Sequence, residues 1–169
     1  MAHMRKSLSA AIVILGAFLT MGEGNSAKKT KWLTGKVKHE GFPLHLRFPE
    51  KPDFDSLQKK YPKLLVVTHT LSKVKPSGEP EADYNASLAD FDHELVTALD
   101  SPSFGKTVLI ETFGGRRTYY IYVSPDTPVD VTKSRFSSKY PQHQLSWELS
   151  DDAGWKFIRR YSADYKFYK

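Results

Sequence analysis

The sequence contains no cysteine, so neither disulfide bonds nor thiolate metal ligands can stabilise the fold. Stability must therefore come from side-chain packing. A chain of this size is long enough for one domain that buries about 68% of its unfolded surface without covalent staples. We therefore expect residues 28–169 to form a single domain.

Motifs of the common enzyme classes are also missing. The sequence has no G-x-S-x-G, no P-loop and no H-E-x-x-H. The closest approach to a metal-ligand pattern is Asp90-x-x-His93-Glu94, which places three polar groups within little more than one helical turn. Such residues are more often the solvated face of an amphipathic helix. We therefore predict no catalytic residues, no metal and no cofactor.

Histidines are few, and the sequence pairs none of them with a nucleophile. His69 on a predicted central strand could be a general base, but a single histidine there is more often a hydrogen-bonded core residue. His39, His45 and His143 are isolated in the sequence. An alternative remains open in which His69 or His93 works with a nearby carboxylate in a hydrolase-type enzyme of the envelope. That alternative requires a deep pocket with strongly shifted titration.

Only one long hydrophobic run is present, from Leu8 to Met21, behind the basic residues Arg5 and Lys6. It is shorter than the roughly 20 apolar residues of a spanning helix and is followed by small and polar residues, which favours a secretory signal peptide over residues 1–27. Cleavage would leave a mature chain that begins near Lys28 in the periplasm or outside the cell. An uncleaved anchor and a buried core helix are the alternatives. Residues 1–3 precede a second methionine, Met4, and are typical of an expression remnant.

The formal net charge is +6, but the basic residues are scattered along the chain. A nucleic-acid site concentrates such residues on one face, whereas scattered ones usually form a solvated surface. The charge therefore argues against nucleic acid as the partner. The clusters are Lys28-Lys29-x-Lys31, Lys59-Lys60 with Lys63, Arg116-Arg117 and Arg159-Arg160.

Hydrophobic periodicity predicts the secondary structure of the mature chain. Residues 64–69 form a continuous apolar run, as in a strand covered on both faces, whereas residues 144–150 alternate, as in a strand with one solvated face. Gly114-Gly115 between two extended segments predicts a tight hairpin, and the two prolines and glycine of residues 72–81 predict a long exposed loop. The expected elements are strands at 32–38, 44–48, 64–69, 106–113, 117–123 and 144–150, a helical turn at 55–60, a helix from an Asp83 N-cap to Leu99, and a helix from Thr127-Pro128 to about Lys139.

From Leu64 onward the predicted order is β-α-β-β-α-β, the split arrangement of ferredoxin-like domains. We therefore predict an α+β fold of this type in which the first and third strands are central and the second and fourth are edges. Right-handed crossovers place both helices on one face of the sheet. The other face is then expected to be open, with Ser146, Glu148, Tyr120 and Tyr122 on it. An N-terminal β-hairpin over residues 32–48 must either extend this sheet or cover it.

Several segments together resemble the bacterial family named domain of unknown function 695. They are Tyr61-Pro62-Lys63-Leu64-Leu65, the acidic and aromatic helix 83–99, the strand-Gly-Gly-Arg-strand unit 108–123, and Asp151-Asp152-Ala153-Gly154-Trp155. The resemblance covers roughly residues 32–161 and implies the fold more than a function. Relatives are sometimes joined to domains that resemble ribonuclease E inhibitors, which implies a binding role.

Tyrosine and arginine dominate protein-interface hot spots, so the third predicted strand indicates protein recognition. We predict an exported, non-catalytic protein-binding module of the bacterial envelope that binds through Arg116, Arg117, Tyr120, Tyr122 and Glu148. An inhibitor or immunity-type protein is one form of this role. One alternative is an RNA-binding domain, because related topologies stack bases on this strand. Another is self-association through the edge strand 145–149.

Overall fold

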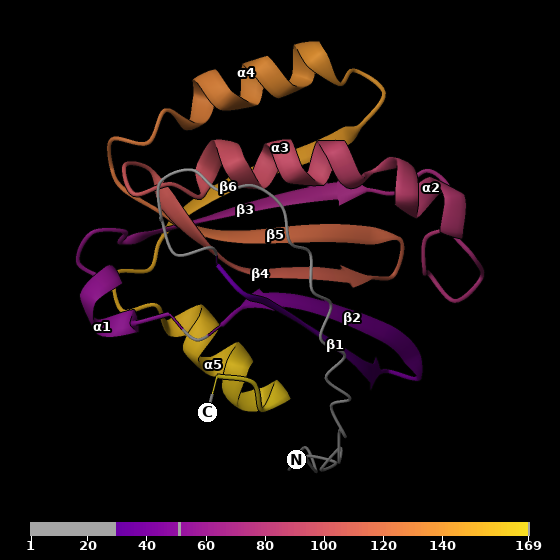
Figure 1. The fold of residues 1–169 in the computed structure, drawn as a ribbon, viewed down its shortest axis with the longest axis horizontal. Helices are drawn as coiled ribbons and strands as arrows, with labels where there is room; N and C mark the ends of the chain where they lie inside the picture. Colours follow the sequence, from indigo (N-terminus) through magenta and orange to yellow (C-terminus); the bar gives the residue numbers. More distant parts are fainter. Residues whose placement is uncertain (1–29, 51, 169) are drawn as a thin grey trace, which may run out of the picture.

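The computed structural model describes residues 30–50 and 52–168. The predicted signal peptide lies outside the described residues. The fold is α+β, as predicted, with one antiparallel sheet and helices on both of its faces (Figure 1). In chain order the elements are β1 (Trp32–His39), β2 (Phe42–Pro49), α1 (Phe54–Leu57), β3 (Lys63–Thr70), α2 (Ala82–Ser87), α3 (Ala89–Leu99), β4 (Gly105–Phe113), β5 (Arg116–Val123), α4 (Val129–Lys139), β6 (Gln144–Asp151) and α5 (Lys156–Tyr165).

The sheet has six strands in the order β1-β2-β4-β5-β3-β6. The apolar strands β3 and β5 are central and the alternating strand β6 is an edge, as their patterns predicted. Residues 106–113 lie in β4, the outer strand of the last four, as predicted, but β4 is not an edge of the whole sheet. β2 pairs with β4 around Leu46 and Glu111, so the N-terminal hairpin extends the sheet, and β1 becomes the other edge.

Two tight turns depend on residues with positive φ. Gly114 and Gly115 have φ values of 55° and 76°, as the Gly-Gly pair predicted for the hairpin between β4 and β5. The segment predicted as an exposed loop folds back on this turn: the Gly115 N–H donates to the Gly78 carbonyl at 2.9 Å. A Cβ at Gly78 would lie 2.9 Å from the Gly114 Cα, so the contact requires glycine.

The helix predicted over residues 83–99 is two helices. α2 has no buried residue, whereas α3 buries Phe91, Leu95 and Leu99 against the sheet. The chain changes direction at Leu88, which is itself almost fully buried. The predicted N-cap was also wrong, because the N-cap of α2 is Glu81 and the helix begins at Ala82, two residues earlier than an Asp83 cap allows. Packing of the apolar stripe therefore set the position of α3, but only weakly that of α2.

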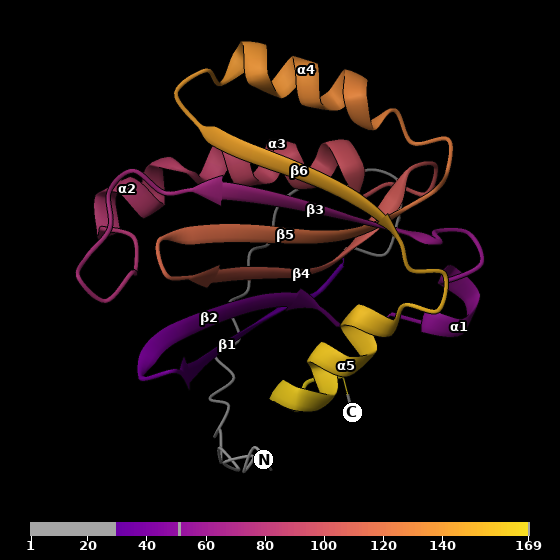
Figure 2. The same ribbon diagram turned by 180° about the vertical axis from the view of Figure 1, so that it is seen from behind.

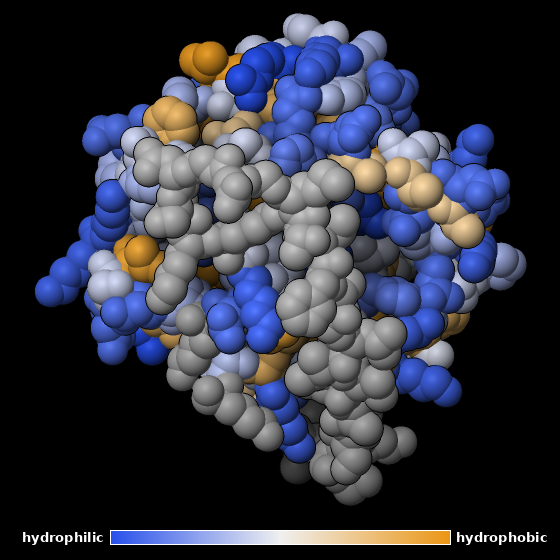
Figure 3. Space-filling model, viewed as in Figure 1, coloured by the Kyte–Doolittle hydropathy of each residue, from blue (hydrophilic) through white to orange (hydrophobic). Residues whose placement is uncertain are grey.

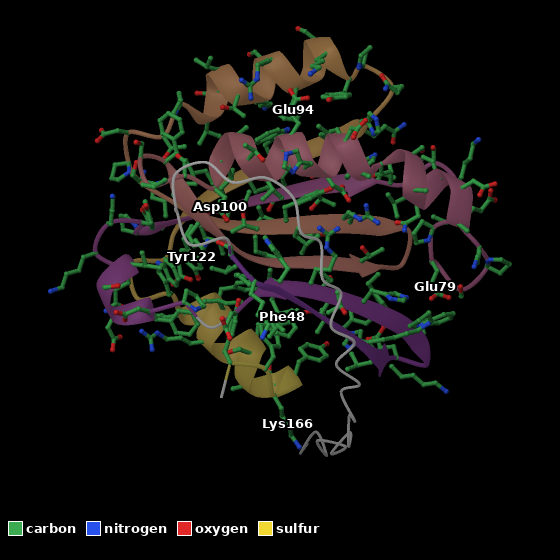
Figure 4. All side chains as sticks on the ribbon, viewed as in Figure 1. Phe48, Glu79, Glu94, Asp100, Tyr122 and Lys166 are labelled. Carbon is green, nitrogen blue, oxygen red and sulfur yellow. The ribbon has the colours of Figure 1, made fainter. Side chains whose placement is uncertain are left out.

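Helices α3 and α4 lie on one face of the sheet, as expected, and α5 lies on the other (Figure 2). The expectation of an open face was wrong. Tyr122 is fully buried, stacks on Trp155 with ring centroids 4.1 Å apart, and donates to the Asp152 carboxylate at 2.6 Å. Tyr120 stacks on Phe157 at 4.5 Å. Figure 4 shows Tyr122 and Phe48 in the layer between the sheet and α5.

The core therefore has two layers, one on each side of the sheet. The layer under α3 and α4 is built around Leu65, Phe91, Leu95 and Tyr119. The layer under α5 is rich in aromatic rings. Over α4 the visible surface is mostly hydrophilic (Figure 3). No helix within residues 30–50 and 52–168 has the length and apolar character that a membrane crossing requires.

Candidate functional site

The structure separates the five predicted partner-binding residues. Tyr120 and Tyr122 lie under α5, whereas Arg117, in the opposite phase of the same strand, points to the side of α3 and is buried. Arg116 is exposed at the start of β5. Glu148 is exposed on β6, opposite Val66 of β3. These side chains do not form one continuous surface.

Arg117 instead belongs to a buried ion pair that connects the sheet to the helices. Its guanidinium donates to the Asp92 carboxylate of α3 at 2.5 Å, to the Asn85 side-chain carbonyl of α2 at 2.5 Å, and to the Thr112 hydroxyl of β4 at 3.2 Å. Asp92 also accepts a hydrogen bond from the Tyr119 hydroxyl. Because both charges are almost completely desolvated, the pair is tolerated only with this full set of hydrogen bonds.

A second arginine shares the same carboxylate. Arg47 on β2 contacts the Asp92 Oδ2 atom at 3.5 Å, while Arg117 already holds that oxygen at 2.5 Å. The Arg47 side chain is 45% exposed, and its guanidinium lies 5.9 Å from the centre of the Trp32 ring. One carboxylate therefore faces two guanidinium groups, and the outer one is accessible to solvent.

These residues form the floor of a groove of about 840 Å³. The groove exists because the hairpin extends the sheet beyond the layer formed by α3 and α4 (Figure 1). Its helix wall carries Ala82, Ala86 and Ala89, whose small side chains leave the space open. A volume of several hundred Å³ is typical of ligand-binding clefts. The groove is lined by Trp32, His45, Arg47, Lys75, Glu79, Pro80, Ala82, Asn85, Ala86, Ala89, Asp92, His93, Val96, Thr112 and Arg117.

Glu79 lies at the end of the groove near the β1–β2 turn, and Figure 4 shows it on the segment that precedes α2. Its carboxylate lies 2.7 Å from the His45 ring and accepts hydrogen bonds from Lys36 and Ser77, each at 3.0 Å. The bond from His45, followed by that from Lys36, lowers the pKa of Glu79 to about 2. Glu79 is therefore a carboxylate at neutral pH, and the lining combines three permanent cations with two carboxylates.

The other histidines lie away from the groove or do not converge in it. His69 is buried, and its Nε2 atom lies 2.9 Å from the His143 Nδ1 atom. Burial, with smaller contributions from the nearby His143 and Arg117 charges, lowers the pKa of His69 to about 4. His39, which seemed isolated in the sequence, is bonded to the Tyr165 hydroxyl. The expectation that His45 and His143 are isolated was likewise wrong.

The motif Asp90-x-x-His93-Glu94 does not converge on a point. Asp90 is exposed, His93 lines the groove, and Glu94 accepts hydrogen bonds from Lys139 and Tyr140 of α4. Among the residues that the structure describes, no group of three or more potential ligands could hold a metal ion.

Sequence reasoning missed the groove, although one signal for it was present. Arg117 occupies the same strand phase as Tyr119 and Ile121, which are fully buried. A cation in a buried phase requires a carboxylate partner, and Asp92 at the phase of Leu88 and Leu95 on α3 meets that requirement. The contribution of Arg47 has no such signal, because it depends on how the hairpin joins the sheet.

The fold and the groove define a small α+β domain with an extended antiparallel sheet and a polar, positively biased cleft beside its helix layer. The chain belongs to the family described as "Family of unknown function (DUF695)", whose model matches residues 30–161. The match includes the hairpin, the groove and most of α5. Comparison with curated proteins gives no match, and comparison with solved structures gives none either.

Proposed function

We propose that this protein is an exported, non-catalytic binding module of the bacterial envelope, and that it captures an acidic segment of a partner protein in the groove. The observation that carries the proposal is the sharing of one carboxylate by two arginines. Asp92 is committed to Arg117, so Arg47 presents an accessible guanidinium that a carboxylate of the partner can bind. Inhibition of an envelope enzyme or a toxin is one form of this role.

The rest of the groove suits a polypeptide ligand. Trp32 and Val96 provide apolar surface beside the cations, and the exposed guanidinium lies next to the Trp32 ring. Interface hot spots combine arginine and tryptophan in this way. Because Arg117 is fixed by three hydrogen-bonded partners, the floor is ordered before a ligand arrives, which reduces the entropy cost of binding.

The same contacts favour binding over acid-base catalysis. The two Asp92 oxygens accept hydrogen bonds from Tyr119 and Arg117, so the contacts of this carboxylate join the helix to the sheet. His69, considered as a base from the sequence, contacts His143 rather than a carboxylate. The RNA-binding alternative required bases to stack on Tyr120 and Tyr122, and α5 covers that surface.

One contact favours the enzyme alternative enough to be weighed. His45 and Glu79 form a histidine-carboxylate pair at 2.7 Å at the end of the groove, and Ser77 lies next to it. In a serine triad, however, the hydroxyl bonds to the histidine and the carboxylate orients the histidine from its other side. Here the Ser77 hydroxyl donates to Glu79. This order of contacts holds a loop in place and does not activate a nucleophile.

Affinity capture from envelope extract, with quantitative mass spectrometry, tests the proposed groove. The test variant is Arg47→Gln, which removes the accessible charge and retains a polar side chain of similar length. The control is Arg160→Gln, a matched loss of an exposed arginine on α5, outside the groove. We expect Arg47→Gln to weaken capture by about tenfold or more, equivalent to about 1.4 kcal/mol, and Arg160→Gln to leave it unchanged. Equal recovery of every captured protein by both variants and by the wild type would refute the proposal.

The export part of the proposal depends on the sequence of residues 5–27 and is tested separately. We expect the protein recovered from the envelope of its native host to have an intact mass that begins near Lys28. Recovery of the unprocessed mass from the cytoplasm alone would reject export while leaving the groove proposal standing.

A further inference from the structure

The open edge of β6 is unusual for a strand of its length. β6 pairs with β3 over all eight of its residues, and no other strand of the described residues lies beside it. Natural edge strands are commonly protected by lysine, proline, a bulge or a short length. β6 contains no lysine and no proline, and its register with β3 shows no shift. All eight of its residues are exposed or half-exposed.

The hydrogen-bond phase of the sheet identifies which backbone groups of β6 point outward. The Asp152 N–H donates to the Pro62 carbonyl at 2.9 Å, and the Leu71 N–H donates to the Gly115 carbonyl at 2.9 Å. Hydrogen-bonded and non-hydrogen-bonded pairs alternate along an antiparallel ladder. These two bonds therefore show that the backbone groups of the even-numbered residues of β3 hydrogen-bond to β6, and those of the odd-numbered residues to β5. The outward N–H and C=O groups of β6 therefore belong to Leu145, Trp147, Leu149 and Asp151.

We propose that β6 pairs with β6 of a second copy of this chain, antiparallel and centred on Trp147, so that two sheets join into one. In this register the outward residues oppose one another and can exchange backbone hydrogen bonds about a two-fold axis. On the helix side of the sheet Leu145 faces Leu149 of the partner copy. On the other side Ser146 faces Glu148.

Side-chain identity selects this register over its neighbours. A register displaced by one residue would place each apolar residue opposite a polar one, and the two side chains would point to opposite faces of the joined sheet. Two neighbouring registers keep the faces matched. One is centred on Ser146, pairs only residues 144–148 of each copy and leaves the exposed Leu149 outside the paired segment. The other is centred on Glu148. It would bring the two Glu148 carboxylates directly opposite each other and would place Leu145 against Asp151, both of which are destabilising. The register centred on Trp147 avoids both conflicts.

Exposed apolar surface lies at the same edge. Among the described residues four large hydrophobic side chains are exposed, and two of them, Leu149 at 48% and Val131 at 69%, line one hollow between α4 and β6. In a dimer paired at β6, Leu149 of one copy would pack against Leu145 of the other copy and be shielded from solvent. The occupant is therefore a copy of this chain, because in this register the apolar residues of β6 face one another and no two charges of the same sign are opposed.

Cysteine cross-linking tests the pairing and its register, since the natural chain has no thiol. The full chain is prepared as two single variants, Ser146→Cys and Glu148→Cys. In a non-hydrogen-bonded antiparallel pair the opposing Cα atoms are about 4.5 Å apart, within disulfide range. We expect a disulfide-linked dimer when the two variants are mixed and mildly oxidised, and none with either alone. Absence of the linked dimer in the mixture, or its formation by either variant alone, would overturn the proposed pairing.

Analytical ultracentrifugation provides the second measurement. We expect the wild type to sediment as a dimer of the 19.2 kDa chain. Leu149→Lys should give a monomer, because it places a charge in the apolar pair, whereas Phe42→Lys, an equal change at an exposed position on the distant hairpin, should leave the dimer intact. A monomeric wild type, or a dimer retained by Leu149→Lys, would overturn the proposal. Association through the apolar run near the N-terminus cannot imitate the result, since it would not depend on Leu149.

Discussion

At the scale of single residues, Asp92 depends strongly on its partners. It is a buried carboxylate whose oxygens accept hydrogen bonds from Arg117 and Tyr119. Helical periodicity placed Asp92 beside the apolar stripe of α3, but no local pattern in the sequence indicates which cation it meets. The pair forms only because β5 and α3, far apart in the chain, pack against each other.

We expect Asp92→Ala to lower the free energy of unfolding by about 3–5 kcal/mol, because it leaves the Arg117 guanidinium buried without its counter-charge. Urea denaturation monitored by circular dichroism measures the change. Asp90→Ala on the same helix is the matched control, since Asp90 is exposed and should change the free energy by no more than about 0.5 kcal/mol. Equal effects of the two substitutions would show that the buried pair does not stabilise the fold.

His69 makes the stability depend on pH. Its pKa is about 4 in the folded protein, against about 6.5 in the unfolded chain, because burial disfavours the imidazolium ion. Above pH 6.5 the residue is neutral in both states and the stabilisation is complete. As the pH falls from 6.5 to 4, the unfolded chain gains a proton that the folded protein does not, so stability decreases. The total loss is on the order of 3 kcal/mol.

Urea denaturation at a series of pH values between 7 and 4 checks this prediction. We expect the wild type to lose stability across that interval and His69→Asn to lose less, because the variant lacks the titrating group. The comparison removes the contribution of the carboxylates, which titrate in both proteins. Parallel pH profiles for the two proteins would contradict the depressed pKa.

At the scale of elements, helix α5 covers the aromatic surface that the sequence predicted to be open. The sequence correctly predicted the phase of Tyr120 and Tyr122 on β5, but not what lies over them. α5 follows β6 after a short turn in which Asp152 accepts the first backbone N–H groups of the helix, from Lys156 and Phe157. A short segment of this kind has little intrinsic helix stability and forms because its rings pack on the sheet.

Trp155 anchors this helix. It is fully buried, stacks on Tyr122, and donates its indole N–H to the Tyr61 carbonyl at 2.8 Å. We expect Trp155→Ala to destabilise the protein by about 3–5 kcal/mol, through lost burial and the cavity that remains. Chemical denaturation provides the measurement, with the exposed neighbour Lys156→Ala as the control. A change below about 1 kcal/mol would mean that α5 is not an integral part of the core.

Local signals did determine several other elements. The Gly114-Gly115 turn, the continuous apolar run of β3 and the alternation of β6 all predicted the structure correctly, because each reflects a backbone or burial requirement that is local in sequence. The break at Leu88 was missed. A helical stripe at spacings of three and four continues through it, and only tertiary packing distinguishes α2 from α3.

At the scale of the whole molecule, the groove arises from a mismatch between two layers. Six strands form the sheet, but the helices on the side of α3 do not extend over the hairpin (Figure 1). The order of the last four strands could be predicted from the sequence. The position of the hairpin could not, because extending the sheet and covering it satisfy the same hydrophobic pattern. Since Arg47 reaches Asp92 only when β2 pairs with β4, the site also lay beyond prediction.

The most direct test of the account is a titration of isotope-labelled protein with a hexaglutamate peptide, followed by amide chemical shifts in NMR spectra. We expect shift changes that cluster at groove residues such as Asn85 and Thr112, and a peptide affinity that weakens as salt is added. Arg47→Gln should reduce that affinity about tenfold, whereas Arg160→Gln should leave it unchanged. Shift changes located elsewhere on the molecule, or binding that Arg47→Gln leaves unaltered, would contradict the assignment of the groove as the binding site.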